Sequence, residues 1–313
     1  MNAAIIDIGS SSAVVQVVRA QAGRVRILAR EKVSLRLGGA LGADGALHEE
    51  AVARTVATLR RFAELAATHE APVLAVATEA MRRARNAADV CAAIEADAGV
   101  RLQVIDGTQE AALVFAGLRL SRPNNPLLGV DLGGGSTELV FGAGDQLERA
   151  VSLPLGAVTL TERVGLGGPA SGAAIAAAEA EIAGHLGPAA VDFAGRVERL
   201  VGASGSAQRI GRLVLGRDGR LGEDLDGLLL TPADLDWAVR TLAPLSHADR
   251  LALPGMDPER ADVLLAGAMV LRAVVASLRA SALEVALSGI RAGLSAMALG
   301  LLPLAPGLLP PRR

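Results

Sequence analysis

The spacing of apolar positions changes repeatedly along the first third of the chain. Stretches rich in Val, Ile and Ala predict three successive β-strands, at residues 3–9, 13–20 and 24–35. Residues 49–68 switch to a helical period, with apolar side chains at 52, 56, 59 and 62 on one face. The rest of this part predicts strands at 71–78 and 101–106, and helices at 86–99, with Asn86 as N-cap and Gly99 as stop, and at 107–120.

A second run of elements begins after residue 126 with the same order, three strands and then alternation with helices. The predicted strands are 127–133, 136–142, 146–153 and one from residue 196, which runs into a helix at about Ser206. The predicted helices are 156–164, 171–187, 232–243, 257–278 and 288–300. The Pro-rich tail after residue 300 is expected to fray.

The two runs also share a motif. "IIDIGSSSAVVQV", residues 5–17, returns as "GVDLGGGSTELVF", residues 129–141, and Asp, Gly and Ser recur at one constant offset. The clearest linker is "SRPNNP", residues 121–126. The pattern therefore predicts an α/β protein of two similar domains, residues 1–121 and 122–313, whose two turns face a shared cleft and whose last helix packs back on the first domain.

Composition narrows the class of protein. The 313 residues are 51% hydrophobic but only 2% aromatic, with a formal net charge of −2, which argues against a nucleic-acid reader. The single cysteine, Cys91, excludes a disulfide within the chain and a multi-Cys metal site. The N-terminus lacks the features of a signal peptide, and the most apolar C-terminal stretch contains Arg272. We therefore expect a cytoplasmic protein without a membrane segment.

The two Gly/Ser turns have features of phosphate-binding sites. Successive backbone N–H groups in a Gly-rich turn form a concave anion site, although a Gly-rich hairpin can equally be only a turn. Because a carboxylate beside a phosphate repels it unless a cation intervenes, Asp7 and Asp131 suggest Mg²⁺ ligands, joined by Glu138 if the turn folds it back. The candidate phosphate-binding residues are Ser10, Ser11 and Ser12 in the first turn and Gly133, Gly134, Gly135 and Ser136 in the second.

Three further stretches carry candidate chemistry. "VGASGSAQRIGRL" places Ser204, Gly205 and Ser206 where a strand meets a helix N-terminus, a geometry that favours anions. "EAMRRARN" gathers Arg82, Arg83 and Arg85, which can bind phosphate or simply be solvated. Glu110 lies in the first turn of its helix, either as a favourable dipole partner or as a general base toward water.

The ordered motifs resemble those of the exopolyphosphatase and guanosine pentaphosphate phosphohydrolase family, from residue 4 to about residue 300. "DLGGGSTELV" followed by "SLPLGAV" is the most specific part. The resemblance implies the actin-like ATPase fold, two ribonuclease-H-like domains around a central cleft, in the short two-domain form. It also implies Glu110 as catalytic base, Asp131 and Glu138 as Mg²⁺ ligands, Arg82 as a phosphate contact, and a homodimer.

Four positions depart from the family pattern. Ser11 replaces an Asn, and Val14, Ala112 and Thr159 stand where cationic residues are common. We therefore expect weaker binding of long polyphosphate, or a shorter or different phosphorylated substrate. Hydrolysis of inorganic polyphosphate is the leading hypothesis; the alternatives are guanosine pentaphosphate hydrolysis, a non-catalytic phosphate or nucleotide sensor and, less favoured, a sugar or acid kinase.

Overall fold

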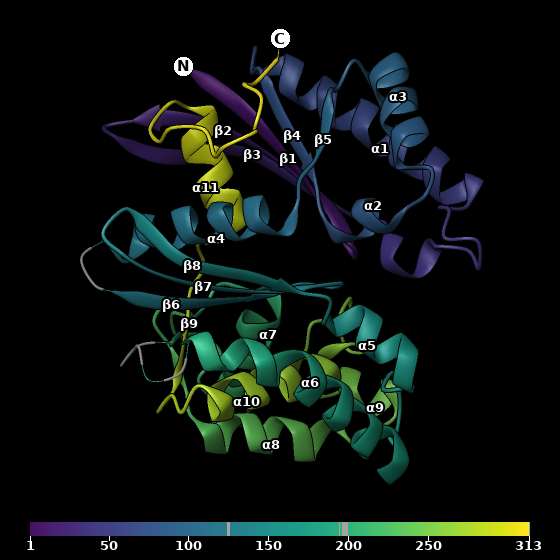
Figure 1. Ribbon diagram of the computed structural model, residues 1–313, viewed down its shortest axis with the longest axis vertical. Helices are drawn as coiled ribbons and strands as arrows, with labels where there is room; N and C mark the ends of the chain where they lie inside the picture. Colours follow the sequence, from purple (N-terminus) through teal and green to yellow (C-terminus); the bar gives the residue numbers. More distant parts are fainter. Residues whose placement is uncertain (124–125, 194, 196–199, 313) are drawn as a thin grey trace. The chain divides into compact units, whose positions relative to one another are not determined.

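The chain divides into two compact units in a computed structural model, drawn in Figure 1. The structure describes residues 1–123, 126–193, 195 and 200–312. Unit 1 comprises residues 1–117 and 290–313, and unit 2 comprises residues 118–289. The chain thus leaves unit 1 within one helix, four residues before the expected boundary, and its last helix belongs to unit 1.

Unit 1 is built on a five-stranded mixed sheet in the order β3-β2-β1-β4-β5. Its strands are β1 (Asn2–Ile8), β2 (Ser12–Gln21), β3 (Arg24–Ser34), β4 (Val73–Ala77) and β5 (Leu102–Val104). Its helices are η1 (Leu37–Ala40), α1 (Glu49–Thr68), α2 (Glu79–Arg83), α3 (Ala87–Ala98), α4 (Gly107–Ser121, which continues into unit 2) and α11 (Ile290–Ala298). The first three strands are antiparallel neighbours, whereas β4 and β5 run parallel to β1.

Strand alternation divides the core of unit 1 between the two faces of its sheet. Ile6 and Ile8 pack with Phe62 of α1 and Ile94 of α3 on one face. On the other face, the cluster that contains Ile5 also holds Leu113 of α4 and Leu294 of α11. Asp7 alternates with Ile6 and Ile8, so its side chain lies on the face that α11 covers.

Unit 2 repeats this sheet and adds one edge strand, in the order β10-β11-β9-β6-β7-β8. Its strands are β6 (Leu127–Leu132), β7 (Thr137–Ala143), β8 (Gln146–Leu153), β9 (Leu200–Gly202), β10 (Leu229–Leu230) and β11 (Leu283–Val285). Its helices are α5 (Ala157–Val164), α6 (Gly172–Phe193), α7 (Gly205–Arg217), α8 (Pro232–Leu242), α9 (His247–Leu251) and α10 (Leu264–Ser277).

The apolar C-terminal stretch forms α10, the central helix of unit 2. It packs against α5, α6, α7 and α8, and most of its side chains are buried. Arg272 reaches out of this apolar surface to Glu179 at 2.9 Å. Among the described helices, none is both long enough and apolar enough to cross a membrane.

The two units therefore share one topology. In each, a strand that carries the motif Asp pairs antiparallel with the next strand and parallel with a later one. This confirms the predicted α/β class with two ribonuclease-H-like units.

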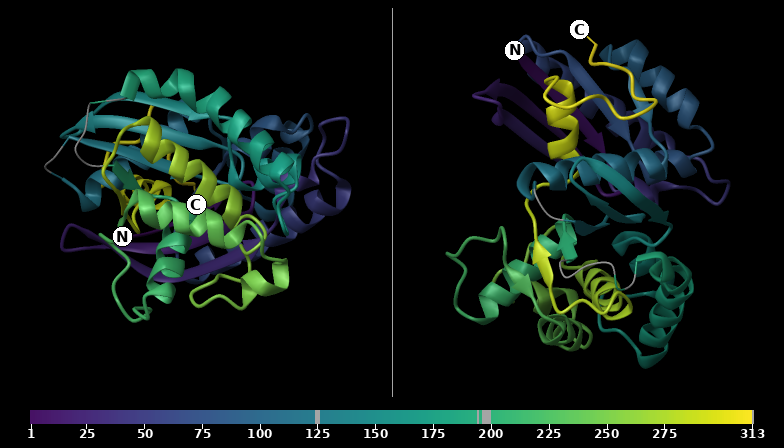
Figure 2. Two further views of the ribbon diagram at one scale, coloured as in Figure 1. Left: turned by 90° about the horizontal axis from the view of Figure 1, so that it is seen from below. Right: turned by 60° about the vertical axis from the view of Figure 1, so that its left-hand side comes forward.

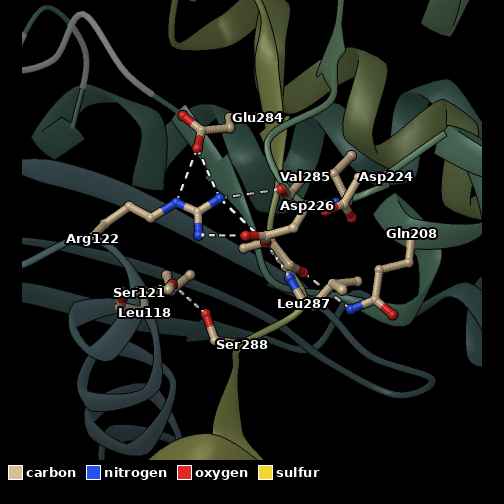
Figure 3. A network of polar contacts seen from close by, with 11 residues as sticks. Leu118, Ser121, Arg122, Gln208, Asp224, Asp226, Glu284, Val285, Leu287 and Ser288 are labelled. Carbon is tan, nitrogen blue, oxygen red and sulfur yellow. Dashed lines mark hydrogen bonds and ion pairs between the residues drawn. The ribbon is translucent and has the colours of Figure 1, made fainter.

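Both places where the chain passes between the units lie beside one polar network of unit 2, shown in Figure 3. Arg122 donates to Glu284 at 2.9 Å and to Asp226 at 3.2 and 3.3 Å. The hydroxyls of Ser121 and Ser288 lie 2.5 Å apart. The start of the predicted linker is thus anchored by side chains, whereas residues 124 and 125 lie outside the described residues.

The expectation that the tail frays is wrong. Leu308 is buried, Val73 and Arg312 exchange two backbone hydrogen bonds at 2.7 and 2.8 Å, and Gln103 bonds the backbone of Leu309. Gln109 donates to the carbonyl of Pro306 at 2.9 Å. Figure 2 shows this tail in yellow beyond α11. Proline rigidity and specific polar contacts hold the segment without regular secondary structure.

Other element predictions need correction at their edges. The predicted helix at 257–278 begins only at Leu264, whereas the helix expected from about Ser206 is confirmed, with its start at Gly205. The helix expected to end at residue 187 continues to Phe193. The first residues of the strand predicted from 196 lie outside the described residues. The short elements α2, α9, β10 and β11 were not predicted as separate elements, because two to five residues carry too little periodicity.

Asn86 occupies the N-cap position of α3 but does not cap it. Its side chain instead accepts from the N–H of Leu47 at 2.9 Å and donates to the carbonyl of the same residue at 3.0 Å. Gly99 ends α3 in a left-handed conformation, as predicted.

Candidate active-site residues

The turn between β1 and β2 is closed and braced by backbone hydrogen bonds. The N–H of Gly9 donates to the carbonyl of Ser12 at 3.0 Å. The carbonyls of Ser10 and Ser11 accept from N–H groups within residues 35–38 at 2.9–3.1 Å. Since these bonds hold the carbonyl oxygens from one side, the turn has a defined shape for presenting its other groups.

Ser10 is also tied to a carboxylate that the sequence analysis did not single out. Its hydroxyl donates to Glu79 Oε2 at 2.9 Å, and both residues are buried. Arg83 donates to the other oxygen of Glu79 at 3.1 Å. The Ser10 proton is therefore committed to Glu79, so in this arrangement Ser10 can offer a phosphate its backbone N–H but not its hydroxyl proton. The only sequence signal was the position of Glu79 directly after a buried strand.

Glu110 and Arg82 form a direct ion pair in unit 1. Glu110 lies in the first turn of α4, is 8% exposed, and its Oε2 accepts from Arg82 Nη1 at 2.7 Å. The same Nη1 donates to the carbonyl of Ile105 at 3.0 Å. In the described part of the chain both of these hydrogen bonds use Nη1, so the other edge of the Arg82 guanidinium still carries donors. Arg82 thus orients Glu110 while keeping N–H groups for an anion.

The side chain of Asp7 forms an ion pair with an arginine of the same unit. Arg291, in the first turn of α11, donates from Nη1 to Asp7 Oδ2 at 3.3 Å. Burial raises the pKa of Asp7, and the charge and hydrogen bond of Arg291 offset part of this rise. The sequence analysis did not name Arg291, because no spacing in the sequence links residue 291 to residue 7.

The turn between β6 and β7 repeats the closing bond of the first turn. The N–H of Gly133 donates to the carbonyl of Ser136 at 2.9 Å. The carbonyls of Gly133 and Gly134 accept from the first N–H groups of α5 at 2.9–3.1 Å. A Cβ at Gly156 would lie 2.2 Å from the Gly134 oxygen and 2.3 Å from the Gly135 nitrogen, so only glycine permits this approach.

Asp131 and Glu138 are brought side by side by the strand register. They are directly opposite each other in the β6–β7 pair, and Glu138 is opposite Ser152 in the β7–β8 pair. Glu138 is 1% exposed and accepts from the Ser152 hydroxyl at 2.7 Å. Two adjacent carboxylates on one face suit a divalent cation that also binds phosphate oxygens. Within the described ranges, no group of three or more His, Cys, Asp or Glu side chains converges as a metal site.

The third turn leads from β9 into α7. Ser204 is the N-cap, and its side chain accepts from the N–H of Ala207 at 2.9 Å. Ser206 donates a long bond, 3.4 Å, to the carbonyl of Leu132, while Gly205 begins the helix. The two hydroxyls thus serve local structure, and the attraction left for an anion is that of the helix N-terminus.

The model of the Ppx/GppA phosphatase family matches residues 16–300. Exopolyphosphatase 1 of Mycobacterium leprae is 30% identical over 279 residues, which cover 87% of this chain and 82% of that protein. An uncharacterized protein of Streptomyces coelicolor, SCO0757, is 34% identical over 276 residues, covering 86% of this chain and 82% of its own length.

Solved structures agree with this relationship. A crystal structure of an exopolyphosphatase from Cytophaga hutchinsonii superposes with a TM-score of 0.89 at 24% identity, covering 97% of this chain and all of that one, which shows the common fold. The Aquifex aeolicus PPX-GPPA enzyme has a TM-score of 0.78 at 27% identity, over 94% of this chain and 98% of its own. These similarities confirm the expected actin-like ATPase fold, and they confirm the expectation that the chain is a phosphatase.

The chain belongs to the Ppx/GppA phosphatase family. It is accordingly a hydrolase of the exopolyphosphatase-like class.

Proposed function

We propose that the chain hydrolyses the terminal phosphoanhydride of inorganic polyphosphate and releases orthophosphate. The observation that carries this proposal is the partly buried ion pair of Glu110 and Arg82, 2.7 Å long, in a chain of this phosphatase family. A carboxylate held by an arginine keeps one orientation, which a general base toward water requires.

Glu110 accepts the proton of the attacking water in this proposal. Arg82 holds the carboxylate through Nη1 and offers its remaining N–H groups to a phosphoryl oxygen. The transition state spreads negative charge over three phosphoryl oxygens, so fixed donors contribute more than covalent chemistry. The backbone N–H groups of the Gly/Ser turn in the same unit, at residues 9–12, are further donors that support this step.

A divalent cation, Mg²⁺ by preference, fits the acids of unit 2. Asp131 and Glu138 would hold it, and it would supply charge neutralisation at the phosphoryl oxygens. Ser152 fixes one oxygen of Glu138 and thereby its orientation. Asp7, in unit 1, already pairs with Arg291, so a divalent cation would have to replace that arginine in order to bind it.

The positions of the aromatic side chains favour polyphosphate over guanosine pentaphosphate as the substrate. The four Phe residues, 62, 115, 141 and 193, are buried in the cores. The guanidinium of Arg217 lies over the ring of Trp237, 4.7 Å from the centre of the ring. A guanine base would thus find no exposed aromatic platform among the described residues, whereas a chain of phosphates needs none.

The test is orthophosphate release from polyphosphate and from guanosine pentaphosphate, with and without Mg²⁺, by the wild type and two variants. Glu110→Gln keeps the size of the side chain but removes its charge and its ability to accept a proton. Turnover should therefore fall about 1000-fold, which is within the usual contribution of a general base to the rate. Glu50→Gln is the matched control, because Glu50 also lies in the first turn of a helix of unit 1 but is exposed.

Three results would count against the proposal. Unchanged turnover in Glu110→Gln removes Glu110 from the chemistry. A higher kcat/KM on guanosine pentaphosphate than on polyphosphate makes the nucleotide the substrate. Tight binding of polyphosphate by the wild type without any phosphate release identifies a sensor instead of an enzyme.

A further inference from the structure

The C-terminal tail, residues 299–312, packs on unit 1 against the start of the helix that carries Glu110. Ala305 and Leu308 of this tail are buried in one apolar cluster. The same cluster contains Ile105, which lies just before α4, and Leu113 of α4 itself. The apolar side chains therefore bring the tail into contact with the segment that leads into α4.

The first turn of α4 is closed by a reciprocal pair of hydrogen bonds. The N–H of Gln109 donates to Asp106 Oδ1 at 2.8 Å, and the N–H of Asp106 donates to Gln109 Oε1 at 3.0 Å. This arrangement is a capping box, in which side chains satisfy N–H groups at the start of a helix. Glu110 is the next residue, and its N–H donates to the carbonyl of Asp106 at 2.9 Å. Asp106 and Gln109 thus fix the backbone from which the Glu110 side chain extends.

The side chain of Gln109 also bonds the tail. Its Nε2 donates to the carbonyl of Pro306 at 2.9 Å, while its Oε1 accepts from Asp106. A glutamate at this position could close the same capping box, but it has no N–H group to donate to Pro306. Gly307 allows the approach, because a Cβ there would lie 2.7 Å from Gln109 Nε2. The two ends of one amide therefore join the start of α4 to the tail.

The segment that contacts the tail also supports Arg82, the partner of Glu110. The carbonyl of Ile105 accepts from Arg82 Nη1 at 3.0 Å, and the same Nη1 donates to Glu110 Oε2 at 2.7 Å. Since the side chain of Ile105 packs with Ala305 and Leu308, the tail touches the support of both members of the ion pair. The ion pair depends in this way on a segment nearly 200 residues away in the sequence.

We propose that the C-terminal tail positions Glu110 and that Gln109 is the positioning residue through which it does so. This inference rests on the proposed function, in which Glu110 accepts the proton of the attacking water. A general base contributes only while its oxygen keeps its direction toward that water, and small displacements of a catalytic group are costly in rate. The contact of Gln109 with Pro306 therefore acts on kcat, whereas substrate binding does not depend on it.

The test compares steady-state hydrolysis of polyphosphate by variants on the two sides of this contact. Gln109→Glu keeps the capping box but loses the donor to Pro306, so kcat should fall about tenfold with KM within about twofold. Gly307→Ala leaves the charge unchanged and displaces the amide from the tail side, so it should lower kcat in the same way. Gln21→Glu is the matched control, because Gln21 is an exposed glutamine of unit 1 that only accepts, from Arg26, and a glutamate still can.

Two further measurements accompany the kinetics. The variant that combines Gln109→Glu with Gly307→Ala should be about as slow as the slower single variant, since both changes break one contact. Hydrogen–deuterium exchange should become faster at residues 105–112 and 305–309 in Gln109→Glu and stay unchanged there in Gln21→Glu. Thermal unfolding of each variant checks that it is folded at the temperature of the assay.

The outcomes separate this inference from the proposed function. If Gln109→Glu turns over polyphosphate as fast as Gln21→Glu, Gln109 does not position Glu110, even though the wild type is an active enzyme. A rise in KM at unchanged kcat, or losses that multiply in the double variant, would also overturn the inference. If the wild type releases no phosphate but Gln109→Glu exchanges faster at residues 105–112, the tail does hold the segment of Glu110 and the proposed function fails. Unchanged exchange in Gln109→Glu would show that the tail does not restrain this segment.

Discussion

The motif hairpins of the two units have the same backbone but different side chains along one row. In unit 1 the row across three strands is Asp7, Val14 and Lys32; in unit 2 it is Asp131, Glu138 and Ser152. Both turns are closed by the same N–H to carbonyl bond, 3.0 Å and 2.9 Å long. The shared hydrogen bonds maintain the same backbone conformation in both turns, whereas the side chains of the row differ between the two units.

That difference separates two electrostatic roles. The row of unit 2 places two carboxylates together, which is costly unless a cation joins them. The row of unit 1 has one carboxylate, already paired with Arg291, and a lysine two strands away. We therefore propose that the row of unit 2 holds a metal ion, whereas the row of unit 1, whose acid is already paired with an arginine, does not. The predictions below test this contrast.

Of the variants that test this contrast, the largest effect is expected at Glu138. Glu138→Gln still accepts the hydrogen bond of Ser152 but loses the charge beside Asp131, so phosphate release should fall about 100-fold or more. Val14→Thr changes the matching position of unit 1 and should leave kcat within about twofold, since no charge is altered. Steady-state kinetics at several Mg²⁺ concentrations measures both variants. Equal losses in the two would show that the rows are not specialised.

A smaller effect is expected at the glycine behind the second turn. Gly156→Ala introduces a Cβ 2.2 Å from the Gly134 oxygen, which should lower the free energy of unfolding by about 2–3 kcal/mol. Gly9→Ala is the control in unit 1, because its Cβ would meet only the Ser12 oxygen at 3.8 Å. Denaturant unfolding compares the two, and a Gly9→Ala variant as unstable as Gly156→Ala would contradict the difference in packing.

Asp7 provides a test through pH. Burial raises the pKa of Asp7 in the folded state, so the unfolded chain loses this proton first as the pH rises above the ordinary value of 3.8. The charge then favours unfolding, and this penalty persists at neutral pH. Asp7→Asn should therefore unfold at a higher temperature than the wild type at pH 7, and the gain should shrink as the pH falls toward 4.

The pH series of melting temperatures decides the sign. A less stable Asp7→Asn at pH 7 would mean that the ion pair with Arg291 contributes more than burial costs.

The smallest effect is expected at Arg36, whose N–H braces the first turn. Arg36 has a left-handed backbone, φ 49°, which strains a residue with a Cβ. Arg36→Gly removes that strain but adds freedom to the unfolded chain, so its unfolding free energy should exceed that of Arg36→Ala by roughly 0.5 kcal/mol. Arg36→Ala retains the strain and should show no gain in the same denaturant titration. Equal stability of the two variants would argue that the strain at Arg36 is negligible.

Much of the architecture could be predicted because local patterns carry it. The strands of both hairpins and α1 follow periods of two and of 3.6 residues, and the recurrence of Asp, Gly and Ser indicated the duplication. Glu110 and Arg82 were candidates from their positions in the sequence, and the resemblance implied their roles. Their hydrogen bond joins residues 28 positions apart, and no local pattern predicts it.

The sequence by itself determined which segments form strands, where the two Gly/Ser turns lie and which acids precede and follow them, because these depend on neighbouring residues. Only the tertiary structure decided that Glu79 takes the proton of Ser10, that Arg291 pairs with Asp7 and that Lys32 stands in the row of Asp7. It also decided that the tail is held rather than frayed. Such pairings depend on strand register and helix packing, which bring distant residues together and which no short window of sequence contains.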